Sequence, residues 1–153
     1  MGLRGKTTTP YMISPAGFRD LNAVRRVEQI CFGKDAWPLI DIIGVLALPG
    51  IVRFKAEIKE QMVGFVAGEA KPWEGTGWIA TIGVVPEYRR QGIALALMEE
   101  CEQKMSLPSV KLCVRKSNEA ALELYRRMGY SQFEVWPNYY QDKEDAIVME
   151  RKR

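Results

Sequence analysis

The spacing of apolar residues changes along the chain and divides it into helical and extended segments. After a short strand at 11–13, apolar positions recur at three- and four-residue steps and predict a helix that opens at Pro15 and reaches Cys31. A second helix is predicted over 38–49, where a Pro-Gly pair ends it. From 51 to 58 apolar and charged residues alternate, which is typical of a half-buried strand.

The second half of the chain mixes short apolar runs with two further helical patterns. The runs predict strands at 62–67, 78–85, 110–114, 133–136 and 146–150. One helix is predicted over 92–105. Another begins at Ser117 or Asn118, either of which can cap it, and ends at Gly129. An antiparallel meander combined with strand–helix–strand units indicates an α/β (α+β) mixed sheet with helices on both faces.

Composition indicates one soluble domain without a nucleic-acid or membrane partner. The 153 residues are 47% hydrophobic and 27% charged, and no apolar run reaches the length of about 18 residues that a membrane span requires. The formal net charge of +3 is too small by itself to imply nucleic acid or a membrane surface. We expect residues 1–9 to form a flexible N-terminus without a signal peptide, and residues 10–153 to form a single cytoplasmic domain, as a monomer or homodimer.

Cysteine and histidine usage narrows the chemistry. The three cysteines, Cys31, Cys101 and Cys113, are widely spaced and form no CxxC pair, so neither a disulfide framework nor a zinc site is predicted. The chain has no histidine, which excludes Ser-His and Cys-His nucleophile systems and histidine-ligated metals. We therefore expect no metal, and catalysis must use tyrosine, cysteine, carboxylates or backbone groups.

A basic loop before the 92–105 helix has the features of an anion site. Arg89 and Arg90 precede Gly92, at the point where the helix begins. The first backbone N–H groups of a helix lack intrahelical acceptors, and together with the helix dipole they attract anions such as a diphosphate. The alternative interpretation is a solvated basic turn before an ordinary helix.

The same loop resembles a family signature. Arg89-x-x-Gly92-x-Ala94 is similar to the (Gln/Arg)-x-x-Gly-x-(Gly/Ala) motif of the GNAT superfamily of N-acetyltransferases. Residues 112–130 look like the fifth strand and fourth helix of that family. Residues 138–149 are similar to the tail of RimI-like ribosomal-protein N-terminal acetyltransferases. The resemblance extends over residues 10–150.

This resemblance implies a GNAT fold, with a mostly antiparallel central sheet whose fourth and fifth strands splay apart and leave a slot for acetyl-CoA. The diphosphate would lie on the amides that open the helix, and the pantetheine arm would pair with the fourth strand. Asn118 would hydrogen-bond the cofactor and Tyr125 would face its sulfur; the simpler interpretations are a helix cap and a packed aromatic. The cofactor-binding residues implied in this way are Ile82, Val84, Val85, Arg89, Arg90, Gln91, Gly92, Ile93, Ala94, Asn118 and Tyr125.

The family mechanism is a direct transfer in a ternary complex, and it implies Tyr125 as the general acid for the departing thiolate. A backbone amide near Val84 would polarise the carbonyl. RimI-like enzymes have a glutamate at the position of Cys113, so that base is absent here. The thiol could face the slot and be functional, or it could be a small packing side chain. Further candidates for remote proton acceptors are Glu69, Glu74 and Asp145.

The missing base favours a weakly basic acceptor. An α-amine with a pKa of about 7.8 needs roughly 1 kcal/mol to lose its proton at pH 7, whereas a lysine with a pKa of about 10.4 needs roughly 4.6 kcal/mol. We therefore expect the acceptor to be a protein or peptide N-terminal α-amine. The resemblance implies an acceptor wall formed by Glu28, Phe32, Tyr139 and Tyr140. Glu28 could hold a cationic amine, or it could be a solvated carboxylate on the polar face of its helix.

Two other functions are compatible with the same motifs. An enzyme for a small-molecule amine, such as a polyamine or an amino acid, would use the same donor site with different acceptor residues. A non-catalytic acyl-CoA sensor would need no base at all. The main argument for it is that Cys113 replaces the glutamate of the RimI-like enzymes.

Overall fold

The computed structural model describes residues 10–153, and the predicted flexible segment 1–9 lies outside them. The strands of these residues form one sheet in the order β1-β2-β3-β4-β5-β7-β6. Their bounds are β1 Met12–Pro15, β2 Ile51–Ile58, β3 Gln61–Lys71, β4 Thr76–Val84, β5 Ser109–Arg115, β6 Ser131–Trp136 and β7 Ala146–Lys152. Neighbouring strands are antiparallel except β4 and β5, which are parallel.

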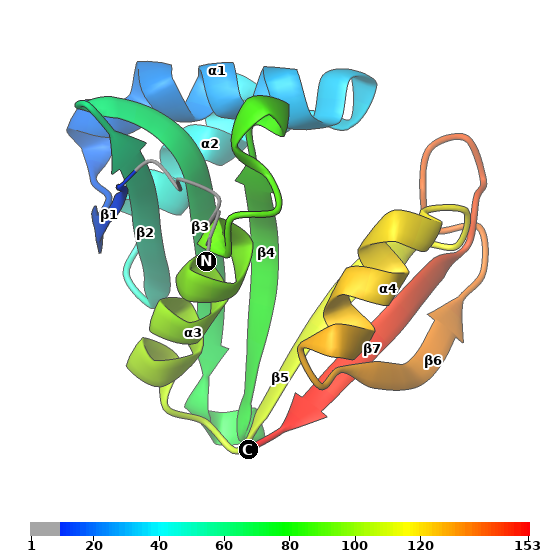
Figure 1. Cartoon of the computed structure of the whole chain (residues 1–153). Coiled ribbons are helices and arrows are strands. Elements are labelled where there is room, and N and C mark those ends of the chain that lie inside the picture. Colours follow the sequence, from blue (N-terminus) through cyan, green and yellow to red (C-terminus); the bar gives the residue numbers. More distant parts are fainter. Residues whose placement is uncertain (1–9) are drawn as a thin grey trace, which may run out of the picture.

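The helices of the described chain cover both faces of this sheet (Figure 1). Their bounds are α1 Leu21–Phe32, α2 Leu39–Ala47, α3 Ile93–Met105 and α4 Glu119–Arg127. One buried cluster joins α3 and α4 to one face, and a second joins α1 and α2 to the other. The predicted mixed sheet with helices on both faces is therefore confirmed.

The start of the first helix differs from the prediction. Pro15 ends β1, where it lies opposite Phe54 of β2, and a 3-10 turn over Phe18–Asp20 leads into α1. A proline is tolerated at the end of an edge strand because its missing N–H interrupts no ladder there. Sequence periodicity marked the helix correctly but not the residue at which it begins.

The parallel pair β4 and β5 shapes the molecule. In the described residues these strands pair at three positions, Thr76↔Ser109, Gly77↔Val110 and Trp78↔Lys111. Beyond Trp78, β4 continues beside β3 and β5 continues beside β7, so the sheet opens into a V (Figure 1). This confirms the predicted splay. The opening lies at the carboxyl ends of two parallel strands, a position where open sheets leave room for ligands.

Candidate active site

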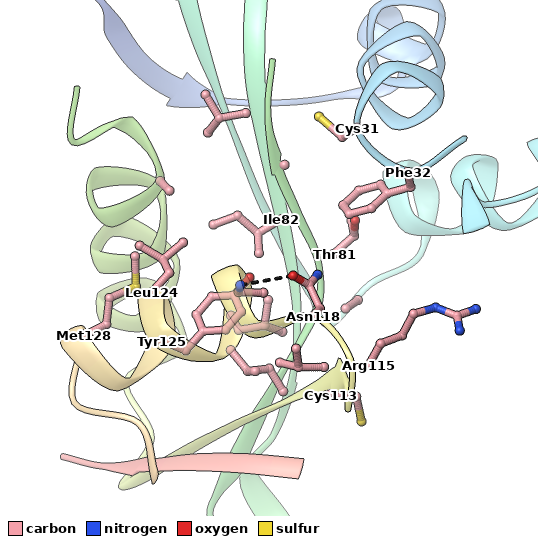
Figure 2. Close-up of a pocket in the computed structure, with 18 of the residues that line it drawn as sticks. Cys31, Phe32, Thr81, Ile82, Cys113, Arg115, Asn118, Leu124, Tyr125 and Met128 are labelled. Atoms are coloured by element: carbon pink, nitrogen blue, oxygen red, sulfur yellow. Dashed lines mark hydrogen bonds between the residues drawn. The ribbon is translucent and has the colours of Figure 1, made fainter. Parts of the chain in front are cut away.

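The V encloses a cavity of about 1750 Å³. Its walls come from β4, β5, α4, the first turn of α3 and the segment between α1 and α2. Figure 2 shows Tyr125 and Asn118 of one arm facing Ile82 and Phe32 of the other. Side chains from both arms and both faces of the sheet therefore meet in one space.

The N-terminus of α3 opens onto this cavity. Gly92 is its N-cap with φ 82°, and Arg90 has φ 65°, so the chain makes two left-handed steps just before the helix. No side chain caps α3, and the amide of Ala96 bonds to the carbonyl of Gly92 at 3.0 Å. Within residues 10–153, the amides of 93–95 have no protein acceptor. Such a turn of unpaired amides fits the oxygens of a diphosphate.

The side chains of this loop are less uniform than the motif implies. Gly92, Ala94 and the exposed Arg90 line the cavity. Ile93 is 1% exposed and belongs to the core, so its backbone amide is what it presents to a ligand. Gln91 does not line the cavity, and its Oε1 is buried with no hydrogen-bond partner among the described residues.

The free edge of β4 differs in one respect from the prediction. Val85 donates its N–H to the carbonyl of Val63 at 2.8 Å, its own carbonyl accepts from Tyr88 at 2.9 Å, and its side chain is 4% exposed. Both of its backbone groups are thus already used, which contradicts its predicted pairing with a cofactor. Because bonded and non-bonded residues alternate along an antiparallel pair, Ile82 and Val84 turn their backbone groups away from β3, toward the slot.

Arg89 is partly committed within the protein. Its Nε donates a hydrogen bond of 2.7 Å to the carbonyl of Val84. Its charge also lies close to Cys31, where burial raises the pKa of the thiol and Arg89 opposes that shift. Both arginines of the motif are exposed, but Arg89 is bound to the end of β4 whereas no hydrogen bond or ion pair engages Arg90 within residues 10–153.

Tyr125 lies on α4 and Asn118 is the N-cap of that helix, which packs on β5. The side-chain oxygen of Asn118 accepts from the amide of Ala121 at 3.1 Å, so the helix-cap interpretation is confirmed; its amide nitrogen is not used by that bond (Figure 2). Burial raises the pKa of Tyr125 to about 12. The phenol therefore holds its proton at neutral pH, as a proton donor must.

Cys113 lines the cavity on the face of β5 opposite Leu112 and Val114, as the strand alternation predicts. Its side chain points away from Tyr125 (Figure 2). Burial, assisted by the charge of Glu134, raises the pKa of this thiol to about 11. A thiol that stays protonated at neutral pH is a poor proton acceptor, so the structure favours a packing role.

Glu28 contradicts the sequence-based interpretations. It is 3% exposed, so it is not a solvated carboxylate on a polar helix face. One carboxylate oxygen accepts from the amide of Trp37 at 3.2 Å and the other from the hydroxyl of Thr81 at 2.6 Å. Glu28 does not line the cavity. Because Glu28 lies behind the lining residues, it does not meet an amine in the cavity directly.

The remaining predicted acceptor residues do meet at the cavity. Phe32, Tyr139 and Tyr140 line it, and the two tyrosine rings are in edge contact with centroids 5.1 Å apart. Tyr139 also packs on Trp136, which stacks on Trp78 at 5.7 Å. An aromatic wall thus runs from the closed part of the V to its mouth.

An ion cluster that no sequence pattern predicted lies at this mouth. Arg115 donates to Asp35 at 2.8 Å, to Asp142 at 3.0 Å and to Glu144 at 2.7 Å, and its guanidinium lies 4.1 Å from the Tyr140 ring centroid. Asp35 belongs to the segment between α1 and α2, and the other carboxylates belong to the segment between β6 and β7. A single arginine at the end of β5 gave no local signal of this cluster, because its partners are far away in sequence.

Other predicted features have mixed outcomes. Glu69 and Glu74 line the cavity, whereas Asp145 does not and instead accepts from the amide of Asn138 at 3.0 Å. In the described part of the chain no group of His, Cys, Asp or Glu side chains has a metal-binding arrangement. Across residues 10–153, every helix is too short or too polar to cross a bilayer.

Comparison with known proteins gives a consistent family. The model of the acetyltransferase (GNAT) family matches residues 23–130. An uncharacterized N-acetyltransferase of Methanocaldococcus jannaschii is 35% identical over an alignment of 139 positions that covers 88% of this chain and 87% of that protein. An N-alpha-acetyltransferase of Sulfurisphaera tokodaii is 27% identical over an alignment of 154 positions, gaps included, that covers 91% of each chain.

Solved structures agree with this result. The ribosomal-protein-S18-alanine N-acetyltransferase of Escherichia coli superposes with a TM-score of 0.83 and 27% identity, covering 94% of each chain. The structure of Arabidopsis thaliana NAA60 in complex with acetyl-CoA has a TM-score of 0.82 at 21% identity, covering 94% of this chain and 98% of that one. The second likeness concerns the fold alone.

Proposed function

The chain belongs to the acetyltransferase (GNAT) family, and we propose that it moves the acetyl group of acetyl-CoA to the N-terminal α-amine of a protein or peptide. Family membership makes the chain an acetyltransferase that uses acetyl-CoA, and so speaks against a non-catalytic sensor. The choice of acceptor is supported by relatives that carry the name N-alpha-acetyltransferase, including the Sulfurisphaera tokodaii protein.

One observation carries the proposal. The unpaired amides that open α3, the free backbone edge of β4 and the protonated phenol of Tyr125 all face a single cavity. A diphosphate, an extended amide-bearing arm and a thioester sulfur need these three kinds of partner, in this order along one ligand. In our proposal Arg90 adds charge to the diphosphate end, and Asn118 contributes the amide nitrogen that its capping bond leaves free.

The chemical step is a direct transfer. The neutral amine attacks the thioester carbonyl, a C–N bond forms and the C–S bond breaks. The backbone N–H of Val84 polarises the carbonyl, because its carbonyl oxygen and not its amide is taken by Arg89. The departing thiolate receives the proton of Tyr125. The phenol recovers a proton from solvent, and the new amide releases the proton of the amine to water.

The choice of acetyl acceptor follows from the absence of a side chain near β5 that could take the proton of the amine. Cys113 keeps its proton, and the buried Glu28 has both oxygens occupied. Deprotonating an α-amine at pH 7 costs only about 1 kcal/mol, so water can serve as the proton acceptor. Deprotonating a lysine costs about 4.6 kcal/mol. The aromatic wall and Phe32 then surround an extended peptide that enters from the mouth.

Initial rates of CoA release with a thiol reagent test this proposal. Matched peptides would carry either a free N-terminus with its lysines removed, or a blocked N-terminus and one lysine. We expect turnover with the first peptide and little with the second. A preference for the lysine peptide, or for a polyamine over both, would contradict the α-amine proposal.

Two variants test the residue assignments in the same assay. Cys113→Ser should keep its turnover, since the thiol is already protonated. Arg90→Ala should raise the Kd of acetyl-CoA by about tenfold, the effect of one charge-assisted contact of 1.5 kcal/mol. A Cys113→Ser variant without activity would return the thiol to the mechanism, and an unchanged Kd for Arg90→Ala would remove that contact.

A further inference from the structure

Glu28 is a buried carboxylate that neither the donor site nor the transfer step uses. It lies near the end of α1, among core residues such as Val24 and Val27. Burial raises its pKa, and within residues 10–153 no lysine or arginine forms an ion pair with it. Burying a carboxylate without a cation is expensive unless hydrogen bonds replace its water. Here two hydrogen bonds replace the water of the carboxylate, and the positions of their donors indicate its role.

Each donor belongs to a different wall of the acceptor side. The amide of Trp37 closes the segment between α1 and α2, and the hydroxyl of Thr81 lies on β4 after that strand has left β5. Trp37 and Thr81 both line the cavity, although Glu28 does not. The carboxylate therefore bridges the segment and the strand from behind, out of reach of any ligand.

The segment held in this way carries the residues that face the acceptor. Between Phe32 and Trp37 it contains Asp35, which forms two bonds of 2.8 Å to Arg115 on the opposite arm. Its own backbone support is slight: the amide of Ala36 bonds to the carbonyl of Gly33 at 3.0 Å. Without Glu28, the position of Phe32 and Asp35 relative to β4 would depend on that turn and on exposed ion pairs.

We propose that Glu28 is a positioning residue that fixes the 33–37 segment against β4 and thereby sets the width of the acceptor entrance. This rests on the proposed function, because it concerns the binding of the amine-bearing peptide. It does not concern the donor, whose proposed contacts come from α3, α4 and the free backbone edge of β4. Loss of Glu28 therefore raises the KM of the peptide and leaves the Kd of acetyl-CoA unchanged.

Hydrogen exchange tests the tether without any substrate. In Glu28→Leu the Trp37 amide loses a bond to a charged acceptor, which is worth about 1.5–3 kcal/mol, so its exchange should accelerate by at least about tenfold. Glu28→Gln should be intermediate, because its amide oxygen can still accept from Trp37 while its nitrogen donates to the Thr81 hydroxyl. Asp20→Asn is the matched control: Asp20 immediately precedes α1 and binds Gly17 and Lys55, away from the cavity.

Steady-state kinetics then test the consequence. We expect the peptide KM to rise in the order wild type, Glu28→Gln, Glu28→Leu, with acetyl-CoA binding and the Asp20→Asn control unchanged. A wild-type rate of Trp37 exchange in Glu28→Leu, or a parallel rise in the peptide KM and the acetyl-CoA Kd, would overturn the proposal. If Glu28→Leu does not fold, Glu28→Gln and Thr81→Val decide the matter by the same criteria.

Failure of this proposal is distinguishable from failure of the proposed function. If the wild-type protein acetylates no free N-terminus, the proposed function is wrong, and the exchange measurement still shows whether Glu28 holds the segment. If the wild-type protein is active and Trp37 exchanges equally fast in all variants, the function stands and the positioning role falls.

Discussion

The two ends of the V are each tied by a cluster of charged side chains. At the closed end, Glu102 of α3 is 1% exposed. It accepts a hydrogen bond from the hydroxyl of Tyr130 and forms ion pairs with Arg151 at 3.1 Å and Arg153 at 3.2 Å. This cluster joins α3 to β7, next to the three residue pairs at which β4 and β5 meet.

At the open end the same kinds of bond occur near water. Arg115 is bound by Asp35, Asp142 and Glu144, whose side chains are 39%, 45% and 23% exposed. Exposed ion pairs contribute little to stability because water and salt compete for the same charges. A buried pair resists separation strongly, because each partner would be left without water. We therefore expect the ion pairs at the closed end to be harder to break than those at the open end.

The largest expected effect comes from breaking the buried cluster. Glu102→Ala leaves the Tyr130 hydroxyl without its acceptor and two arginines without their counter-ion. The expected loss is about 3 kcal/mol, the lower end of the range for buried pairs, because both arginines are about one third exposed. For a chain of this length that lowers Tm by about 6–12 °C. Thermal unfolding followed by circular dichroism measures it; a loss below about 1 kcal/mol would mean that this end is no more fixed than the other.

A substitution in the slot between the two ends should lower the activity of the protein without lowering its stability. Tyr125→Phe removes the proton donor while keeping the ring that packs against Tyr130. We expect kcat to fall by about 10²-fold, the lower end of what a general acid contributes, with Tm unchanged. Single-turnover and steady-state rates on the free-N-terminus peptide measure this. Full activity would show that Tyr125 has only a packing role. A large fall in Tm would show that its hydroxyl contributes to the stability of the fold.

Breaking the exposed cluster should cost less than breaking the buried one. Arg115→Gln leaves carboxylates that water can solvate, so we expect less than half the Tm shift of Glu102→Ala. In 1 M NaCl the Arg115→Gln shift should shrink, because the Debye length falls to about 3 Å, while the Glu102→Ala shift persists. Arg127→Gln, which removes a surface arginine 3.4 Å from Glu123, controls for the loss of one positive charge. Equal salt responses for the two clusters would erase the distinction between the ends.

The sequence predicted local features well and convergent ones poorly. The helices, the strands and the turn before α3 were recognised because periodicity, glycine and proline act over a few residues. The splay of β4 and β5 and the cavity followed from resemblance, since no local signal shows where two strands part. The interpretation of Glu28 was wrong for a related reason. Its helix position looked polar, and only the fold brings Thr81, 53 residues later, to its carboxylate.

The charged clusters were missed because their members are scattered in sequence. Arg115 meets Asp35 across 80 residues, and Glu102 meets Arg153 across 51. Single charged residues on helices and strands normally face solvent, and nothing in their neighbourhood distinguishes these. The predicted pairing of Val85 with the cofactor was wrong because the sequence indicated where the strand ends, but not that the backbone of Val85 is already hydrogen-bonded within the protein.

The smallest expected effect is the pH dependence of the open end. The hydrogen bond from Arg115 lowers the pKa of Asp142, and bonds from Ser117 and Arg115 lower the pKa of Glu144. Carboxylates with lowered folded-state pKa values stabilise the fold above their unfolded pKa values of about 3.9 and 4.3, and this contribution is lost as pH falls through the folded values. The Tm difference between wild type and Arg115→Gln should therefore be constant from pH 7 to 5 and narrow by pH 3. If it persists undiminished at pH 3, the bonds of Arg115 are not ionic, and the mouth is held by the stacking of Tyr140 on the guanidinium instead.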